Sequence, residues 1–445
     1  MKVTALGHSA FLLEMAGEGG RPVRILGDPW LTDYVIGDVM GRFPRVRFDR
    51  EPFPELDAIY LSHSHTDHLD PYSLLSLWGM LQEKPLILLP QSIEYLAAML
   101  RENLQGARIA VLREDDPLQL GGLSVRGLFN LEELGTNEDD VMMLLVEGET
   151  EVFLAEADAV FPYGSPDARE TLASLFCSDT LTTGCILAIK NELHALMASV
   201  HARNREERAL LVEEARQETL AEIESMYQPF EDSGLWDDPR LTRLIGGQGI
   251  CFPQKVDPVW NRVLFPMPLA ERARLEAETA ARYEHQHQVV PFLPGHTITL
   301  QGDSAPESVP CEFLRCLDSP EEFEYDGSVE RFENFPEAPF RDHPVPEDEF
   351  HERLLGVLNH RFLPWLTGRR QPPVEHLLSH YGGEYRIRVR FGTAASYQEQ
   401  DYRFTFASLT FSPAPKEGEA QEVYWAADLD DYLEGRCDDF STFCR

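Results

Sequence analysis

Short apolar runs alternate with helical patterns over residues 1–165 of the chain. Two alternating stretches around the turn "AGEGG" predict strands, "KVTALGHSAFLLEM" and "RPVRILGD". Strands buried on both faces are expected where a run is almost wholly apolar, in "ELDAIYLS" and "PLILLP". Helical spacing follows these runs, in "PYSLLSLWGMLQEK" and "SIEYLAAMLREN". Further strands are expected at "ARIAVLRE", "LSVRGLF", "VMMLLVEG" and "EVFLAEAD". The pattern predicts an α/β sandwich with sheet inside and helices outside.

Helical patterns dominate the following part of the chain, so we expect a helical insertion at about residues 168–285. Residues 303–350 are rich in Pro, Asp and Glu, which predicts an acidic linker or long surface loop. Residues 351–445 combine a helix, "FHERLLGVLNHRFLPWL", with alternating strands such as "EYRIRVRFG". We therefore expect one domain over residues 1–302 and a small α+β domain over residues 351–445.

Charge and composition limit the kinds of molecule that the protein is expected to bind. Acidic residues outnumber basic ones by 76 to 39, a net charge of −37, and such a surface repels nucleic acid and anionic membranes. A small-molecule substrate is the remaining expectation. No apolar run approaches the roughly 20 residues that span a bilayer, and the opening residues lack the apolar core of a signal peptide. The seven cysteines are odd in number and form no C-x-x-C, which favours reduced thiols in a cytoplasm. The oligomeric state has no signal in the sequence.

The candidate chemistry is concentrated in "IYLSHSHTDHLD", which contains His63, His65, Asp67 and His68. Neutral imidazole is the commonest protein ligand of transition metals. In an extended loop, the spacing of His63 and His65 lets both rings converge on one ion, while the adjacent Asp67 and His68 can serve a second ion. The loop follows a buried strand, and open α/β sheets place their sites at the carboxyl ends of strands. The stretch therefore predicts a metal site.

The motif and its surroundings resemble the metallo-β-lactamase superfamily. "GHSAFLLE", "ILGDPWL" and "LSHSHTDHLDPYSL" are similar to the branch that contains ascorbate-phosphate lactonases and N-acylphosphatidylethanolamine phospholipases. The resemblance implies an αββα sandwich with a dinuclear site for zinc or iron, with manganese as a further option. It assigns His63 and His65 to one ion and Asp67 and His68 to the other. In a hydrolase, either Asp67 or the hydroxide between the ions would handle the proton.

The same resemblance places two further residues beside the site. His8 and Asp28 would orient the metal ligands from outside the ligand set. A softer similarity, in "DPWL", "GGQGICFP" and "LPGHTITL", links the chain to the metallo-β-lactamase part of CMP-N-acetylneuraminate hydroxylase-like proteins. Those proteins carry a Rieske cluster, and this chain lacks the ligand pairs of that cluster.

Three ligand positions depart from the family pattern or stay open. No histidine lies between His68 and His194, and Glu132 stands where the family supplies one. A carboxylate there would suit iron or manganese better than zinc. The family's bridging aspartate is best matched by Asp158, with Glu156 as the alternative. The last histidine of the second ion has three candidates, His194, His201 and His296.

Three functions follow from these assignments. The first is hydrolysis of an ester, lactone or phosphodiester-type bond by a hydroxide held between two ions. The second is an O2-dependent diiron oxygenase or hydroxylase, which Glu132 favours. The third is a scaffold without catalysis that keeps metal for stability. The substrate has no readable motif, and fold alone does not decide among the three functions.

Overall fold

The chain divides into two compact units, which are described separately. The first comprises Met1–Leu196 and Val212–Gly327, and the second Met197–Leu211 and Ser328–Arg445. The computed structural model describes residues 1–35, 40–48, 53–129, 141–159, 163, 166–190, 205–228, 234–251, 267–317, 348–362, 384–393, 396–405, 408, 410–416, 418, 420, 422–426 and 429. No helix among these residues is both long and apolar enough to cross a membrane.

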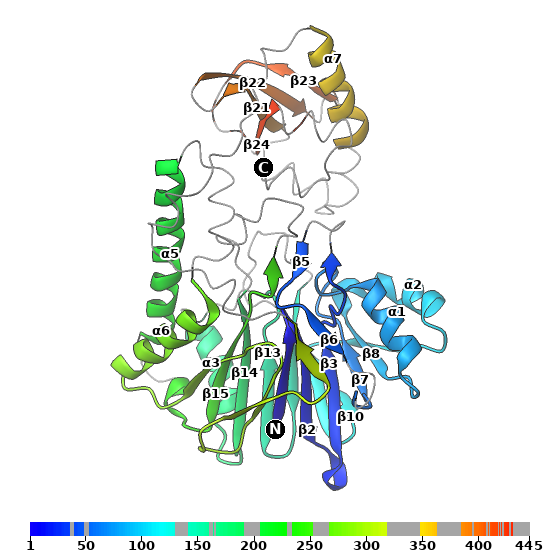
Figure 1. The fold of residues 1–445 in the computed structure, drawn as a ribbon, viewed down its shortest axis with the longest axis vertical. Helices are drawn as coiled ribbons and strands as arrows, with labels where there is room; N and C mark the ends of the chain where they lie inside the picture. The colour runs from blue at the N-terminus through cyan, green and yellow to red at the C-terminus, as the bar shows by residue number, and fades with distance from the viewer. Residues whose placement is uncertain are drawn as a thin grey trace. The chain divides into compact units, whose positions relative to one another are not determined.

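Two large mixed sheets form the first unit (Figure 1). The first sheet has the order β19 (Glu307–Pro310), β18 (His296–Thr299), β1 (Lys2–Gly7), β2 (Ala10–Ala16), β3 (Pro22–Gly27), β7 (Ala58–Tyr60), β8 (Leu86–Pro90) and β9 (Arg108–Leu112). The second has the order β10 (Leu118–Leu120), β11 (Leu123–Phe129), β12 (Met142–Glu147), β13 (Glu151–Ala155), β14 (Thr183–Lys190), β15 (Leu241–Gly247) and β17 (Gln288–Pro291).

An apolar core fills the space between the two sheets. Phe11 of β2 and Phe153 of β13 meet there with ring centroids 5.5 Å apart, and Leu144 of β12 is fully buried beside them. Such a two-sheet core forces inward side chains to alternate with outward ones along each strand. The outward side chains are also apolar, because helices cover the outer face of each sheet.

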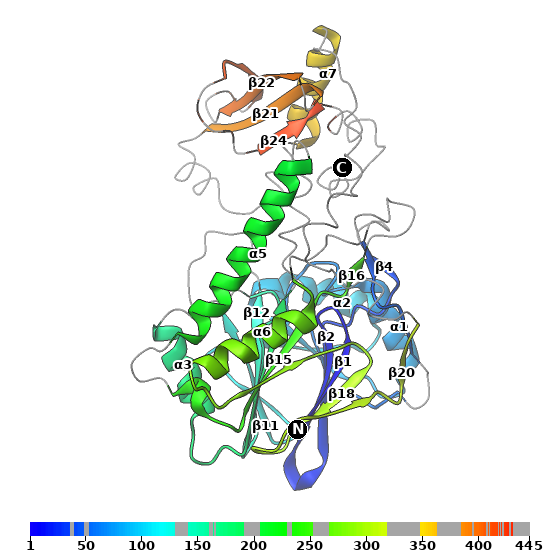
Figure 2. The same cartoon turned by 60° about the vertical axis from the view of Figure 1, so that its left-hand side comes forward.

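The helices lie on both outer faces, which makes the unit an αββα sandwich (Figures 1 and 2). α1 (Pro71–Met80) and α2 (Ala97–Asn103) cover the first sheet, and α3 (Pro166–Phe176), α6 (Leu269–Arg282) and the C-terminal part of α5 (Arg205–Tyr227) pack on the second. α1 starts as the sequence predicts, with Pro71 at its first turn. The Asp70 carboxylate caps it by accepting hydrogen bonds from the Tyr72 and Ser73 amides. The predicted sandwich is confirmed.

Short ribbons and single turns complete the first unit. One ribbon has the order β16 (Ile250–Cys251), β5 (Met40–Arg42) and β4 (Tyr34–Val35), and another pairs β20 (Leu314–Cys316) with β6 (Val46–Phe48). The 3-10 turns are η1 (Glu18–Gly20), η2 (Gln91–Leu96) and η3 (Leu235–Asp237).

The first predicted strand is wrong, because residues 2–16 form a tight hairpin. β1 and β2 are antiparallel with Gly7 opposite Ala10, so His8 and Ser9 make the turn. Gly7 and His8 both have positive φ values, 111° and 50°. The alternation of apolar residues continues across the turn, and His-Ser is not among the dipeptides that usually mark a two-residue hairpin.

The helical insertion predicted at residues 168–285 is also wrong in part. β14 and β15 lie inside that range, and they are parallel neighbours in the second sheet. Every residue of β14 is buried. A short apolar run of this kind cannot be distinguished by periodicity from a buried helical segment. Because the neighbouring segments have helical patterns, the sequence predicts a helix here as well.

The linker predicted at residues 303–350 begins later than expected. β19 pairs antiparallel with β18, and β20 pairs with β6, so residues 307–316 belong to the first unit. β19 is exposed along its whole length and is a strand only because it pairs with the edge of the first sheet. α7 starts at Asp348, slightly before the expected start of the second domain.

The second unit contains a four-stranded sheet and a helix. The sheet has the order β23 (Thr410–Ala414), β22 (Ser396–Thr405), β21 (Glu384–Thr393) and β24 (Glu422–Trp425). α7 (Asp348–Val357) continues into the π-turn η7 (Leu358–Phe362), and Leu354 and Leu358 pack on the buried side chains of β21. The other face of β21 carries arginines, of which Arg388 donates to the buried Asp401 at 2.7 Å.

Candidate metal centre

The loop after β7 carries the histidine motif at the carboxyl end of that strand. His63 and His68 are buried and His65 is exposed, while 18% of the Asp67 side chain remains exposed. His63 Nε2 lies 2.9 Å from His65 Nδ1, so these two rings turn toward each other. The motif therefore presents a concentrated group of nitrogen and oxygen atoms.

Asp158 joins the motif from the turn after β13. Its Oδ2 lies 3.0 Å from His68 Nε2 and 3.8 Å from His63 Nε2. The ligand atoms of these three residues all lie within 4.8 Å of one another. The carboxylate thus stands between two rings that the sequence assigns to different ions, which is the position expected of a bridging ligand.

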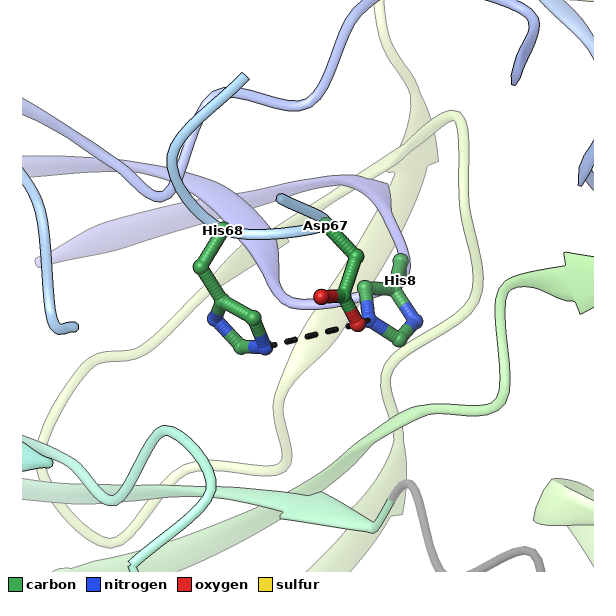
Figure 3. A group of neighbouring side chains, drawn as sticks. All are labelled: His8, Asp67 and His68. Atoms are coloured by element: carbon green, nitrogen blue, oxygen red, sulfur yellow. Dashed lines mark hydrogen bonds and ion pairs between the residues drawn. The ribbon is translucent and has the colours of Figure 1, made fainter. Parts of the chain in front are cut away.

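A second group consists of His8, Asp67 and His68 (Figure 3). His8 comes from the turn between β1 and β2, and the other two from the loop after β7. Asp67 Oδ2 lies 3.0 Å from His8 Nε2 and 3.9 Å from His68 Nε2. The two groups share His68, and each of them could hold a metal ion.

Asp28 and Ser62 hold the rings of the motif from behind. One Asp28 oxygen accepts a hydrogen bond from the Ser62 amide at 2.7 Å, and the other contacts the Ser62 hydroxyl at 2.7 Å and His68 Nδ1 at 2.9 Å. The Ser62 hydroxyl also lies 2.9 Å from His63 Nδ1. Because the Nδ1 atoms are occupied in this way, the Nε2 atoms of His63 and His68 face the site as ligands do.

Three strand ends at the site have non-glycine residues in the left-handed backbone region. His8 follows β1, Asp28 follows β3 and Ala157 lies just after β13, with φ values of 50°, 41° and 50°. Each such residue costs about 1–3 kcal/mol, and such strain is typical of functional sites. At Ala157 this conformation turns the chain so that Asp158 points into the site.

The electrostatics of the cluster favour a bound cation. Burial and the charge of His68 lower the pKa of His63 to about 4, so the His63 ring is neutral near pH 7. Burial alone would lower the pKa of His68, but Asp158 and Asp28 raise it well above its usual value. Burial would raise the pKa of the Asp158 carboxyl, yet His68 lowers it far below the usual range. The site thus gathers the carboxylates of Asp28, Asp67 and Asp158 around buried imidazoles, an arrangement that attracts a cation.

The donor set and its spacing fit a first-row divalent metal. Such ions bind histidine nitrogen and carboxylate oxygen at about 2.0–2.2 Å, which places two ligands of one tetrahedral ion about 3.3–3.6 Å apart. The separations above range from 2.9 to 3.9 Å. Mixed nitrogen and oxygen ligands suit zinc, iron or manganese, and the geometry does not choose among them.

Glu156, the alternative to Asp158, lies in a different environment. It is buried and accepts hydrogen bonds from Arg243 Nη1 at 3.0 Å and from the Tyr163 hydroxyl. Arg243 is fully buried and also donates to Glu276 at 3.0 Å. Glu156 is in neither candidate group among the described residues, because its carboxylate points into this ion cluster behind the turn.

Of the remaining candidate ligands from the sequence, the structure describes only His296. His296 begins β18, and its Nδ1 lies 3.1 Å from the Ser308 hydroxyl, so it belongs to neither group found in the described residues. Glu132, His194 and His201 lie outside the described residues. Sequence reasoning missed Ser62, although its position directly before the first histidine of the motif was the available signal.

Comparisons with known proteins agree with the fold. Residues 2–159 match a family model described as a β-lactamase superfamily domain, so the resemblance predicted from the motif is confirmed over that part of the chain. A Mycolicibacterium smegmatis protein named for a Rieske 2Fe-2S iron–sulfur centre is 34% identical over 74 residues, which is 17% of this chain and 13% of that protein. The chain thus spans only a small part of that relative.

Two solved structures illustrate the likeness in three dimensions. CmlA, a diiron β-hydroxylase from Streptomyces venezuelae, is 16% identical, with 69% of this chain and 54% of that chain covered at a TM-score of 0.41. YhfI from Bacillus subtilis, a metallo-β-lactamase fold protein, is 15% identical, with 42% and 69% covered at a TM-score of 0.28. At these scores neither likeness transfers a reaction to this chain.

The ion cluster behind Asp158 makes a prediction about stability. Arg243→Met would leave Glu156 and Glu276 as buried carboxylates without their shared partner, and we expect it to lower the free energy of unfolding by about 3–5 kcal/mol. The matched control is Arg274→Met on α6, which removes an exposed pair with Glu278. That variant should change stability by no more than about 0.5 kcal/mol. Urea unfolding measures both, and equal small losses would contradict the role given to Arg243.

Proposed function

We propose that the chain is a metal-dependent hydrolase with a dinuclear site. His63 and His65 hold one ion, Asp67 and His68 hold the other, and Asp158 lies between them. The substrate class is a small molecule with an ester, lactone or phosphodiester-type bond. The observation that carries this proposal is the place of Asp158 Oδ2, within 3.8 Å of the Nε2 atoms of both His63 and His68.

The roles of the side chains follow from burial and charge. Two divalent ions would lower the pKa of water and polarise the oxygen of the bond to be cleaved. Asp28 and Ser62 keep the rings of His63 and His68 in register, and burial keeps His63 neutral. Asp67 is partly exposed, and although burial would raise the pKa of its carboxyl, His68 and His8 hold that pKa below its usual range, so Asp67 would pass a proton on to solvent.

One observation favours the diiron oxygenase as a second candidate. The sequence has no histidine between His68 and His194, so Glu132 stands where the family supplies an imidazole. Carboxylate-rich sites suit iron better than zinc. With Asp67, Asp158 and Glu132, the site would have three carboxylates. The hydrolase and the oxygenase differ in the metal that they bind and in whether they consume O2.

Metal content tests the site directly. We expect the full-length protein, purified without added metal, to hold two ions per chain by elemental analysis. His63→Ala should lose about one ion, since the second set remains, and Asp158→Ala should lose both. A wild-type protein that holds a single ion per chain would favour the scaffold alternative, and one that holds no metal would contradict both.

A neighbouring residue provides the control for Asp158. Glu156→Gln keeps the size and most hydrogen bonds of a side chain that points into the Arg243 cluster. We expect this variant to keep both ions and to lose stability only. If Glu156→Gln released the metal and Asp158→Ala did not, the assignment of the bridging ligand would be wrong.

Turnover separates hydrolysis from oxygenation. The metal-loaded protein should cleave members of a panel of phosphodiesters, lactones and esters without O2, and His65→Ala should lower the rate by at least about 100-fold because an ion is lost. Product formation is followed under anaerobic conditions. Two bound irons, uptake of O2 and no anaerobic cleavage would establish the oxygenase instead.

A further inference from the structure

We propose that His8 is itself a ligand of the second ion and supplies the imidazole that the sequence leaves unassigned. This inference rests on the proposed function, because it requires the dinuclear site. It replaces the expectation that His8 orients ligands from outside the ligand set. The turn between β1 and β2 would then contribute directly to the metal centre.

The atoms that His8 contacts support a ligand role. Its Nε2 lies 3.0 Å from Asp67 Oδ2, the same oxygen that faces His68 Nε2 at 3.9 Å. A residue that only orients a ligand contacts that ligand's far side, as Asp28 does at His68 Nδ1. His8 instead points its ring nitrogen at the metal-facing oxygen, and Figure 3 shows the three side chains gathered around that point.

The ring of His8 has no competing polar contact. The side chain is fully buried, and its other nitrogen, Nδ1, makes no hydrogen bond to any described residue. The ring packs edge-on against Trp30, with ring centroids 5.3 Å apart. Its orientation is therefore set by packing on one side and by the metal site on the other.

The backbone around His8 is built to hold it there. His8 has a φ of 50°, a conformation that glycine or asparagine adopts more easily. Gly249, next to β16, lies directly against it, since a Cβ at Gly249 would be 2.1 Å from the His8 amide nitrogen. Backbone strain and close packing are typical of functional residues, and here they occur at a residue whose side chain belongs to a candidate metal-binding group.

No other described histidine outside the motif competes for this place. His296 faces Ser308, and within the described part of the chain His8 is the additional histidine that belongs to a candidate group. With His8 the second ion would have Asp67, His68 and Asp158 as further ligands. That set of two nitrogens and two carboxylates satisfies a tetrahedral or five-coordinate ion.

The test is cobalt(II) titration of the full chain, with d–d absorption and elemental analysis as readouts. His8→Asn suits the left-handed backbone, but its shorter side chain does not reach the position of Nε2, so the ligand atom is removed. We expect the first ion to bind as in wild type and the affinity for the second ion to fall by more than about 100-fold, beyond the 10- to 100-fold typical of groups behind a ligand. His8→Gly should behave alike, and added imidazole should restore the second ion.

Asp28→Asn is the matched control for a group behind a ligand. It should weaken binding by about 10- to 100-fold and gain nothing from imidazole. Two results would overturn the ligand role of His8 while the proposed function stands, provided that wild type binds two ions. In the first, His8→Asn keeps its affinity for the second ion within about 10-fold of wild type. In the second, imidazole does not rescue His8→Gly, and this variant matches Asp28→Asn. If wild type itself binds fewer than two ions, the proposed function fails.

Discussion

The hydrogen bonds of the Asp28 carboxylate are the constraint on which the site depends. They tie the end of β3 to the Ser62 amide and hydroxyl at the end of β7, and they fix the ring of His68. Because neighbouring parallel strands end at the same edge of a sheet, one carboxylate can orient two buried imidazoles at once. The sandwich contributes by keeping these two strand ends adjacent, and Asp28 adopts a left-handed backbone to reach across.

The sequence predicted the parts of the molecule that repeat a simple pattern. Alternating and wholly apolar runs reveal most strands, and the dense motif after β7 predicts the family model that residues 2–159 match. Prediction from the sequence failed where the local backbone conformation is not reflected in the spacing of apolar residues. Nothing in "GHSA" marks a two-residue turn at His8, and a fully apolar β14 resembles buried helix. Glu156 and Asp158 would share a face in a regular strand, and only the conformation of Ala157 separates them.

The ion cluster behind that turn explains how so acidic a chain tolerates buried carboxylates. Arg243 lies between Glu156 and Glu276, and Arg272 donates to the same Glu276 at 3.0 Å. Removing both partners' charges would be less harmful than removing one, because an unpaired buried charge is the expensive state. In this cluster, the buried carboxylates are thus paired locally with buried arginines.

The side chains of the candidate metal centre differ in their exposure to solvent, which affects how an ion would exchange with the surrounding solution. The imidazoles of His8, His63 and His68 are sealed by protein, whereas Asp67 and Asp158 retain 18% and 21% of their side-chain area. Water, chelators and incoming ions therefore meet these two carboxylates and the exposed His65 before the three buried rings. Exchange of a bound ion would begin at these exposed ligands.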